Sequence, residues 1–339
     1  MSVTETPQTA DAPAKPAREE WNWHPELPIG NSPVFDWPPR PVAVVKWFSR
    51  SWLRLSEQSL FALTAVIVWL YFQPALELCK ELEFGWVAQV YLRNLVLMVV
   101  VAGGLHLYFY TYRKQGKALK YDPREMAKKG RSYTFNNQVW DNMFWSLASG
   151  VTQWSMYEVL LLWGFANGYA PFLNWSDSPL LFLGWFLIIP IFTSFHFYWV
   201  HRFLHWPPLY RLAHALHHRN TNVGPWSGLS MHPLEHLIYL SSVLIHLVIA
   251  SHPIHVFFHM YFNTLGAATT HTGYEGMLMK DKNQLNLGSF HHQLHHRYFE
   301  CNYGNQPMPW DRWFGSFHDG TPEATERVRE RRRRMHGAA

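Results

Sequence analysis

Two long apolar runs constrain the fold of this chain more than any other feature. Residues 59–78 read SLFALTAVIVWLYFQPALEL, and residues 86–110 read WVAQVYLRNLVLMVVVAGGLHLYFY. Each run is long enough for a helix to cross the roughly 30 Å hydrocarbon core of a bilayer. Two more runs, near 152–173 and 179–200, are separated by the short turn NWSDS. The sequence therefore predicts an all-α integral membrane bundle with about four transmembrane helices.

The distribution of positive charge predicts the orientation of these helices. The loop 113–131 is strongly basic, and four basic residues flank the start of the first span: Arg40, Lys46, Arg50 and Arg54. Cytoplasmic segments of membrane proteins carry an excess of lysine and arginine. We therefore expect a multi-pass protein in which both segments, and with four spans both termini, lie on the cytoplasmic side.

Histidine is concentrated in one part of the chain. Of the 21 histidines, 17 lie between His196 and His296, in runs such as HRFLH, HALHH and HHQLHH. Positions i, i+3 and i+4 share one face of a helix, so the spacing within each run directs its imidazoles the same way. The three runs supply eight candidate metal ligands: His201, His205, His214, His217, His218, His292, His295 and His296.

The number of these histidines indicates two metal ions. A single zinc ion takes about four ligands, so eight clustered imidazoles are too many for it. Imidazole suits zinc, copper, iron and nickel, and nitrogen-rich ligation with open positions fits iron that handles dioxygen. Zinc could still replace iron in a purified sample. Only two cysteines occur, Cys79 and Cys301, which excludes a disulfide framework or a cysteine-based zinc site.

Further polar residues near the runs are expected to support the ligands rather than to bind metal. Metal-bound histidines need a partner for their other ring nitrogen. Glu300 and Asp311 are also candidates to orient imidazoles. The expected neighbours of the ligands or of the substrate pocket are His196, His232, Glu235, His236 and His291.

One site for all the histidines requires a particular topology. The apolar stretch 237–262 is interrupted by SHP at 251–253. If this stretch crossed the membrane once, HHQLHH would lie on the side opposite HRFLH. The one-site hypothesis therefore predicts a re-entrant helical hairpin with its turn near Pro253, and a cytosolic helical cap that holds the metal site.

These features divide the chain into four expected parts. Residues 1–45 are rich in proline, and their start is polar without the apolar core of a signal peptide, so a disordered or irregular arm is expected. Residues 46–178 hold the first helices and the basic loop, 179–320 form the catalytic domain, and 321–339 form a basic tail. The tail contains RVRERRRR, which we expect to meet anionic lipid headgroups rather than nucleic acid.

The histidine runs closely resemble those of the fatty acid hydroxylase/sterol desaturase superfamily of integral membrane non-haem di-iron enzymes. The family pattern is HX3H, HX2HH and a later HX2HH, in the order found here. The family has a further ligand in a segment like HTGYE (271–275), so the resemblance implies His271 as a ninth ligand. The flanking segments YWVHRFLH, HPLEH and ECNYGNQPMPWDRWFGSFHDG are also similar, and the resemblance covers about residues 180–320.

The resemblance implies an enzyme that uses two iron ions, dioxygen and external electrons to hydroxylate or desaturate a lipid C–H bond. Relatives that hydroxylate sphingolipid fatty acids often have a second histidine where Ala267 stands here, so a sterol or related lipid is the favoured substrate. No HPGG haem motif occurs. Electrons are therefore expected from a separate protein, either cytochrome b5-like or of ferredoxin type with a reductase.

Three other functions remain open at this stage. A hydroxylase of a fatty acyl, carotenoid or ether lipid fits the same motifs. An inactive scaffold that retains the fold is harder to reconcile with complete histidine runs. A membrane metal transporter or sensor predicts ionisable residues through several spans. Spans 59–78 and 152–173 contain only Glu77 and Glu158 as charged residues, which disfavours that class.

Overall fold

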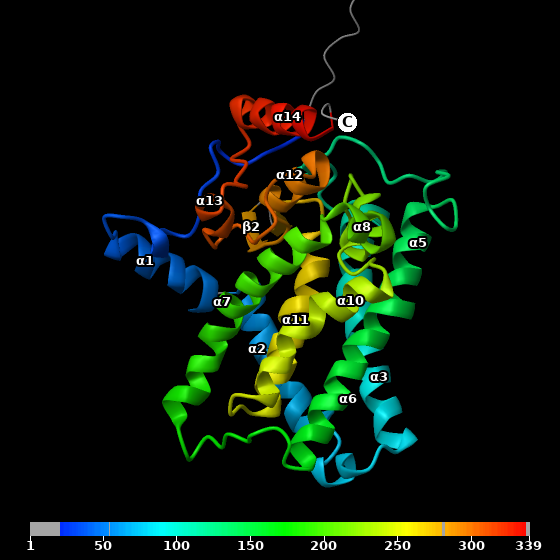
Figure 1. Ribbon diagram of the computed structural model, residues 1–339, viewed down its shortest axis with the longest axis vertical. Coiled ribbons are helices and arrows are strands. Elements are labelled where there is room, and N and C mark those ends of the chain that lie inside the picture. The colour runs from blue at the N-terminus through cyan, green and yellow to red at the C-terminus, as the bar shows by residue number, and fades with distance from the viewer. Residues whose placement is uncertain (1–20, 54, 280–281, 337–339) are drawn as a thin grey trace, which may run out of the picture.

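The computed structural model describes residues 21–53, 55–279 and 282–336, so the first twenty residues of the expected N-terminal arm lie outside the described residues. The described chain is mostly helical, with one two-stranded antiparallel hairpin (Figure 1). Its α-helices and strands are α1 (Pro41–Phe48), α2 (Glu57–Tyr71), α3 (Phe84–Met98), α4 (Gly104–His106), α5 (Gln138–Trp145), α6 (Thr152–Ala166), α7 (Pro179–Leu204), α8 (Pro207–Leu209), α9 (Ala215–His218), α10 (Pro233–Tyr239), α11 (Pro253–Thr270), β1 (Gly276–Met279), β2 (Lys282–Asn286), α12 (Phe290–Tyr298), α13 (Trp310–Trp313) and α14 (Pro322–His336).

Three helical segments of the described chain are long and apolar enough to cross a membrane. They are Pro41–Tyr71 with 31 residues, Phe84–Thr111 with 28 and Pro179–Leu204 with 26, the first running through residue 54, which is not described. The expected span near 152–173 is not among them. Residues 138–166 instead form one continuous helix through α5, a π-helical turn and α6. The predicted total of about four spans therefore stays a prediction.

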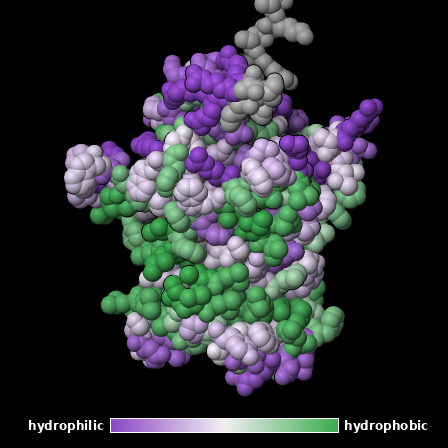
Figure 2. Space-filling model, viewed as in Figure 1, coloured by the Kyte–Doolittle hydropathy of each residue, from purple (hydrophilic) through white to green (hydrophobic). Residues whose placement is uncertain are grey.

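The outer surface of the bundle is apolar in a band. Outward-facing side chains of the long helices include Leu63, Leu92, Val96, Leu180 and Leu183, each more than half exposed. Figure 2 shows this apolar surface over the lower and middle part of the molecule, between hydrophilic ends. Exposed apolar surface of this extent marks a face that contacts an apolar medium. The band and the three long helices indicate a membrane protein.

A helical hairpin occupies the centre of the bundle. From α10 and the 3₁₀ segment Leu240–Leu247 the chain descends, reverses at residues 248–252, and returns as α11. At the reversal the Ser251 amide donates to the Pro171 carbonyl at 3.1 Å, and the Leu173 amide donates to the Ser251 carbonyl at 2.9 Å. Almost every residue of α11 is buried. The reversal returns the chain to the end of the bundle where α7 finishes.

A buried ion pair joins two of the helices around this hairpin. Arg93 of α3 pairs with Glu158 of α6, and both side chains are almost fully buried. The Glu158 carboxylate also accepts from the Trp154 indole at 2.7 Å and the Asn94 amide at 3.1 Å. A buried charge is tolerated where it is paired and its remaining hydrogen-bonding capacity is used. The pair therefore fixes α3 against α6.

The histidine-rich end is closed by segments from both ends of the chain. Ser289 caps α12, because its hydroxyl accepts from the His292 amide at 3.2 Å. The Ile29 amide donates to the Asp319 carbonyl at 2.9 Å, and Ile29 packs with Phe290 of α12. Helix α12 is thus held between the segment before α1 and the segment before α14.

Candidate metal centre

The nine sequence-predicted ligands come from four elements that meet at one end of the bundle. They lie at the end of α7, in the π-helical turn Tyr210–His214 with α9, directly after α11, and in α12. The structure gathers them into two groups. Within each group, every histidine has one ring nitrogen that lies within 4.8 Å of the corresponding nitrogens of the other members. Histidine group 1 contains His201, His205, His214, His218 and His295, and histidine group 2 contains His217, His271, His292 and His296.

Each HX2HH run is divided between the two groups. In the α9 run the first and last histidines, His214 and His218, belong to group 1 and the middle one belongs to group 2. In α12 the first and last, His292 and His296, belong to group 2, and His295 belongs to group 1. Residues four apart share a helical face more closely than residues three apart. The two groups therefore share α9 and α12, and neither could form without both helices.

Three imidazole nitrogens in each group form a nearly equilateral triangle. In group 1 the Nε2 atoms of His205, His218 and His295 are 3.0 to 3.2 Å apart. In group 2 the Nε2 atoms of His271, His292 and His296 are each 3.1 Å apart. At a metal–nitrogen distance of about 2.1 Å, ligands at right angles lie about 3.0 Å apart, and tetrahedral ligands about 3.4 Å. The observed spacings lie within this range, so three nitrogens of each group are close enough to bind one metal ion.

The other ring nitrogen of several ligands has a fixed acceptor. The Nδ1 atoms of His201 and His295 lie 2.8 and 2.6 Å from the carbonyl oxygens of Tyr303 and Cys301. The Nδ1 of His271 lies 2.8 Å from the Ala267 carbonyl oxygen, one turn earlier. A carbonyl can only accept, so each of these Nδ1 atoms carries the proton and Nε2 presents a lone pair. Nε2 atoms about 3 Å apart, with some of them fixed as lone-pair donors, are the arrangement expected of a metal site.

Glu235 of α10 supplies the corresponding partner for His214. Its Oε1 lies 2.7 Å from Nδ1 of His214, and both side chains are almost fully buried. The His214 Nε2 is buried without a hydrogen-bond partner in the described part of the chain, so it remains available to a metal. Burial raises the pKa of Glu235 well above its usual value. Carboxylate–histidine–metal arrangements of this kind orient the imidazole and raise its basicity.

Burial keeps the ligands neutral and dry. Eight of the nine are buried, and His205 is half-buried. Burial lowers the pKa of His217 to about 4, and it lowers the pKa of His292, His295 and His296 well below the usual value. A histidine must be unprotonated to bind a metal. The site is therefore prepared for a cation at neutral pH.

Four other predicted neighbours of the ligands lie near the site without touching a ligand nitrogen. His196 pairs with the Ser241 hydroxyl at 3.0 Å, and the Nδ1 of His232 accepts from the Leu234 amide as the cap of α10. His236 lies between the Ser149 hydroxyl at 2.8 Å and the Leu229 carbonyl at 3.2 Å. The fourth, His291, is buried 3.5 Å from Asp311.

The two other acidic candidates contact a loop rather than the imidazole of a predicted ligand. Glu300 accepts from the Tyr303 hydroxyl at 2.8 Å. Asp311 accepts from the backbone amides of Tyr303 and Gly304 and from the Ser316 hydroxyl, at 2.7 to 2.8 Å. This loop carries the Cys301 and Tyr303 carbonyls that orient two ligands. Sequence reasoning missed these carbonyls, because any residue type can supply one.

Comparison with known proteins agrees with this geometry. Residues 186–316, which include all nine histidines, match the fatty acid hydroxylase family. The resemblance expected from the histidine runs is thereby confirmed for this part of the chain, which begins within α7 and ends just before α14.

Several relatives that match this part of the chain are named as sterol desaturases. The chain is 32% identical over 133 residues to a Delta(7)-sterol 5(6)-desaturase of Eremothecium gossypii, and 33% identical over 136 residues to that of Saccharomyces cerevisiae. Each alignment covers 39% of this chain, and it covers 37% and 36% of the two relatives. The chain thus matches little more than a third of these relatives' lengths. No solved structure matches the chain.

Proposed function

We propose that this protein is a membrane-embedded non-haem di-iron oxidoreductase that desaturates or hydroxylates a C–H bond of a sterol or related lipid. The observation that carries the proposal is the pair of adjacent histidine groups at the end of apolar helices. The names of the relatives support desaturation of a sterol, while hydroxylation of a fatty acyl, carotenoid or ether lipid is the alternative.

Each histidine group is proposed to hold one iron ion. Bound there, the two ions would supply dioxygen activation and the redox chemistry needed to break an unactivated C–H bond. The nitrogen-rich donor set of each group supports iron that handles dioxygen. Zinc could occupy the same imidazoles in a purified sample, because imidazole also suits zinc.

The overall reaction requires a source of electrons. Desaturation removes two hydrogens from the lipid and consumes one dioxygen, two electrons and two protons, giving two water molecules. Hydroxylation consumes the same reactants and puts one oxygen atom into the lipid and the other into one water molecule. A separate redox protein, either cytochrome b5-like or of ferredoxin type with its reductase, is proposed as the donor.

The protein's own groups have three roles in this scheme. Glu235 and the carbonyls of Ala267, Cys301 and Tyr303 hold the imidazoles in the tautomer that leaves Nε2 free. Phe197 stacks on His201 with ring centroids 4.8 Å apart and helps to exclude water. The apolar band lets a lipid approach laterally from the bilayer. A dry site protects reactive species from side reactions.

The distribution of charge supports one orientation of the protein in the membrane. The basic loop 113–131 and α14 lie toward the same end of the molecule as the histidine groups (Figure 1). Cytoplasmic segments are enriched in lysine and arginine. We therefore propose that the metal centre and both termini face the cytoplasm and that the α10–α11 hairpin enters the bilayer from that side.

A lipid profile under isotopically labelled dioxygen tests the function. Host cells would express either the intact protein or a His205→Ala/His295→Ala variant, each with a candidate donor and reductase. A new lipid two hydrogens lighter, without label, is expected for a desaturase, and a new lipid with labelled oxygen identifies a hydroxylase. Iron-free protein recovered from iron-replete cells would contradict the proposal.

A further inference from the structure

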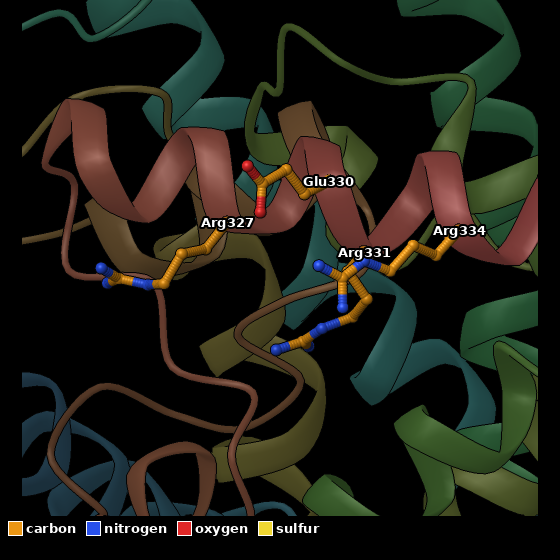
Figure 3. Close-up of a pocket in the computed structure, with 4 residues that line it drawn as sticks. All are labelled: Arg327, Glu330, Arg331 and Arg334. Atoms are coloured by element: carbon orange, nitrogen blue, oxygen red, sulfur yellow. The ribbon is translucent and has the colours of Figure 1, made fainter.

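One face of α14 carries three arginines that form no ion pair in the described part of the chain. Arg327, Arg331 and Arg334 line an open surface pocket of about 370 Å³ together with Glu330 (Figure 3). All four side chains are exposed. No ion pair within residues 21–53, 55–279 and 282–334 involves these three arginines, whereas Glu326 pairs with other arginines of the helix. We call Arg327, Arg331 and Arg334 the arginine face.

The arginine face is far from the apolar band. Helix α14 lies at the pole of the molecule beyond α12 and α13 (Figure 1). Figure 2 shows that this pole is hydrophilic and that the apolar band lies below it. Headgroups next to the band would contact the lower part of the cap, not this pole. The expectation that the basic tail meets lipid headgroups stays a prediction, and the position of α14 at this pole favours a soluble partner.

A short path of rings connects α14 to a proposed metal ligand. The Arg332 guanidinium lies 5.9 Å from the ring centroid of Phe299, at the end of α12. The Phe299 ring in turn lies 4.9 Å from the ring of His218, inclined by 33°. Phe299 is half-buried, so its ring reaches from the surface to histidine group 1.

The backbone at Phe299 supports a specific role for this ring. Its φ angle is 70°, in the region that a bulky non-glycine residue rarely adopts. Such conformations cost free energy and gather at functional sites, where the surrounding structure maintains them. Here the conformation ends α12 and directs the ring against His218.

We propose that the arginine face is the docking surface for a small acidic redox protein, and that Phe299 is the point where its electrons enter histidine group 1. The inference rests on the proposed function, because a dioxygen-reducing centre needs a reductant. Each donor molecule gives up one electron and leaves oxidised, and two such visits supply the two electrons consumed per dioxygen. The positive face attracts an acidic partner and orients it over the ring.

Stopped-flow kinetics test the docking surface. The full chain, loaded with iron in detergent, would oxidise the reduced haem domain of a cytochrome b5, used as the acidic probe. Arg327→Gln/Arg334→Gln is expected to lower the second-order rate constant about tenfold at low salt and to flatten its salt dependence. Lys128→Gln/Lys129→Gln removes equal charge from another exposed segment and is expected to leave the rate unchanged. Equal rates for both variants would overturn the proposal.

Two further measurements separate docking from other roles. Phe299→Leu is expected to slow electron transfer at saturating probe at least tenfold, with unchanged probe affinity and iron content. An unchanged rate would remove Phe299 from the path.

A defect of the arginine variant that occurs only in nanodiscs containing anionic lipid would assign the face to the lipid surface and overturn the proposal. If the wild type makes no product even with dithionite, the proposed function fails, while salt-dependent binding of the oxidised haem domain still tests the docking surface.

Discussion

At the scale of single residues, orientation of the imidazoles depends on a few acceptors. Glu235 is the acidic candidate that touches a ligand, with Oε1 2.7 Å from Nδ1 of His214. Glu300 is also a glutamate close to the site, but it accepts from the Tyr303 hydroxyl instead. These two glutamates therefore separate the effect of a direct imidazole contact from that of a nearby acidic side chain.

Replacing Glu235 with alanine is expected to weaken metal binding in group 1. Loss of such a partner typically lowers metal affinity by about 10–100-fold. Metal content after dialysis against a graded series of chelator concentrations measures the change. Glu300→Ala is the matched control: it removes a contact to the Tyr303 loop but none to an imidazole, so its loss of metal affinity should be smaller. Equal affinity in the two variants would show that Glu235 does not orient His214.

The identity of the ligands was more predictable than their arrangement. Helical spacing and the family resemblance pointed to nine histidines, and the structure brings all nine together; their role as ligands stays a prediction. The division of each run between two groups was not predicted. It depends on the exact angle between α9 and α12 and on the π-helical turn Tyr210–His214, which spacing alone does not encode. The carbonyl partners depend on loop conformation, which sequence motifs specify weakly.

At the scale of elements, close contacts between backbones position the ligands. Gly228 lies against α11, and a Cβ atom there would lie 2.0 Å from the Ala267 carbonyl oxygen. That same oxygen accepts from Nδ1 of His271. The packing of the segment before α10 against α11 therefore helps to position the carbonyl that orients His271 of histidine group 2.

Gly228→Ala is expected to destabilise the fold by about 1–3 kcal/mol, because the added methyl group meets backbone that cannot move freely. It should also lower the metal content of group 2, since the His271 acceptor is displaced. Thermal unfolding in detergent and metal analysis measure both effects. Gly184→Ala, in α7 where nothing lies within 4 Å of the added atom, is the control and should be neutral or slightly stabilising. Similar unfolding temperatures for both variants would contradict the steric argument.

The buried ion pair between α3 and α6 gives a second test at this scale. Glu158→Leu leaves Arg93 buried without its carboxylate, which is expected to cost about 3–5 kcal/mol. Combining it with Arg93→Met removes both charges and should recover much of that loss. Unfolding of the two single variants and the double variant in detergent forms a double-mutant cycle. Strictly additive losses would mean that the pair contributes no coupling.

At the scale of the whole molecule, the fold separates an apolar bundle from a histidine-rich cap. The predicted helix over 179–200 corresponds to α7, but α2 ends at Tyr71 instead of residue 78. Pro74 explains this difference, because the residue before a proline avoids the helical conformation. Polar groups inside the bundle, such as Glu158, lower the hydropathy of the α5–α6 helix. The place of that helix in the bundle is therefore apparent from its packing, not from its amino-acid composition.

Cysteine labelling tests the topology of the hairpin. Val248 is exposed at the reversal, close to the connection between α6 and α7. Val248→Cys is expected to react with a membrane-impermeant reagent from the same side as Ser176→Cys and the opposite side from Lys129→Cys. The native Cys79 and Cys301 are buried, so background labelling should be low. Labelling of Val248→Cys from the side of Lys129 would contradict the arrangement.

The division of the HX2HH runs has a consequence for how the protein acquires its metals. Because α9 and α12 each contribute to both histidine groups, the first ion to bind would order two helices that the second ion also uses. Binding of the second ion would then require less ordering of the protein, so the second ion would bind more tightly, which is positive cooperativity. Half-loaded protein would be scarce during titration, and the loss of one ion would promote the loss of the other. The two ions would therefore bind together and be lost together.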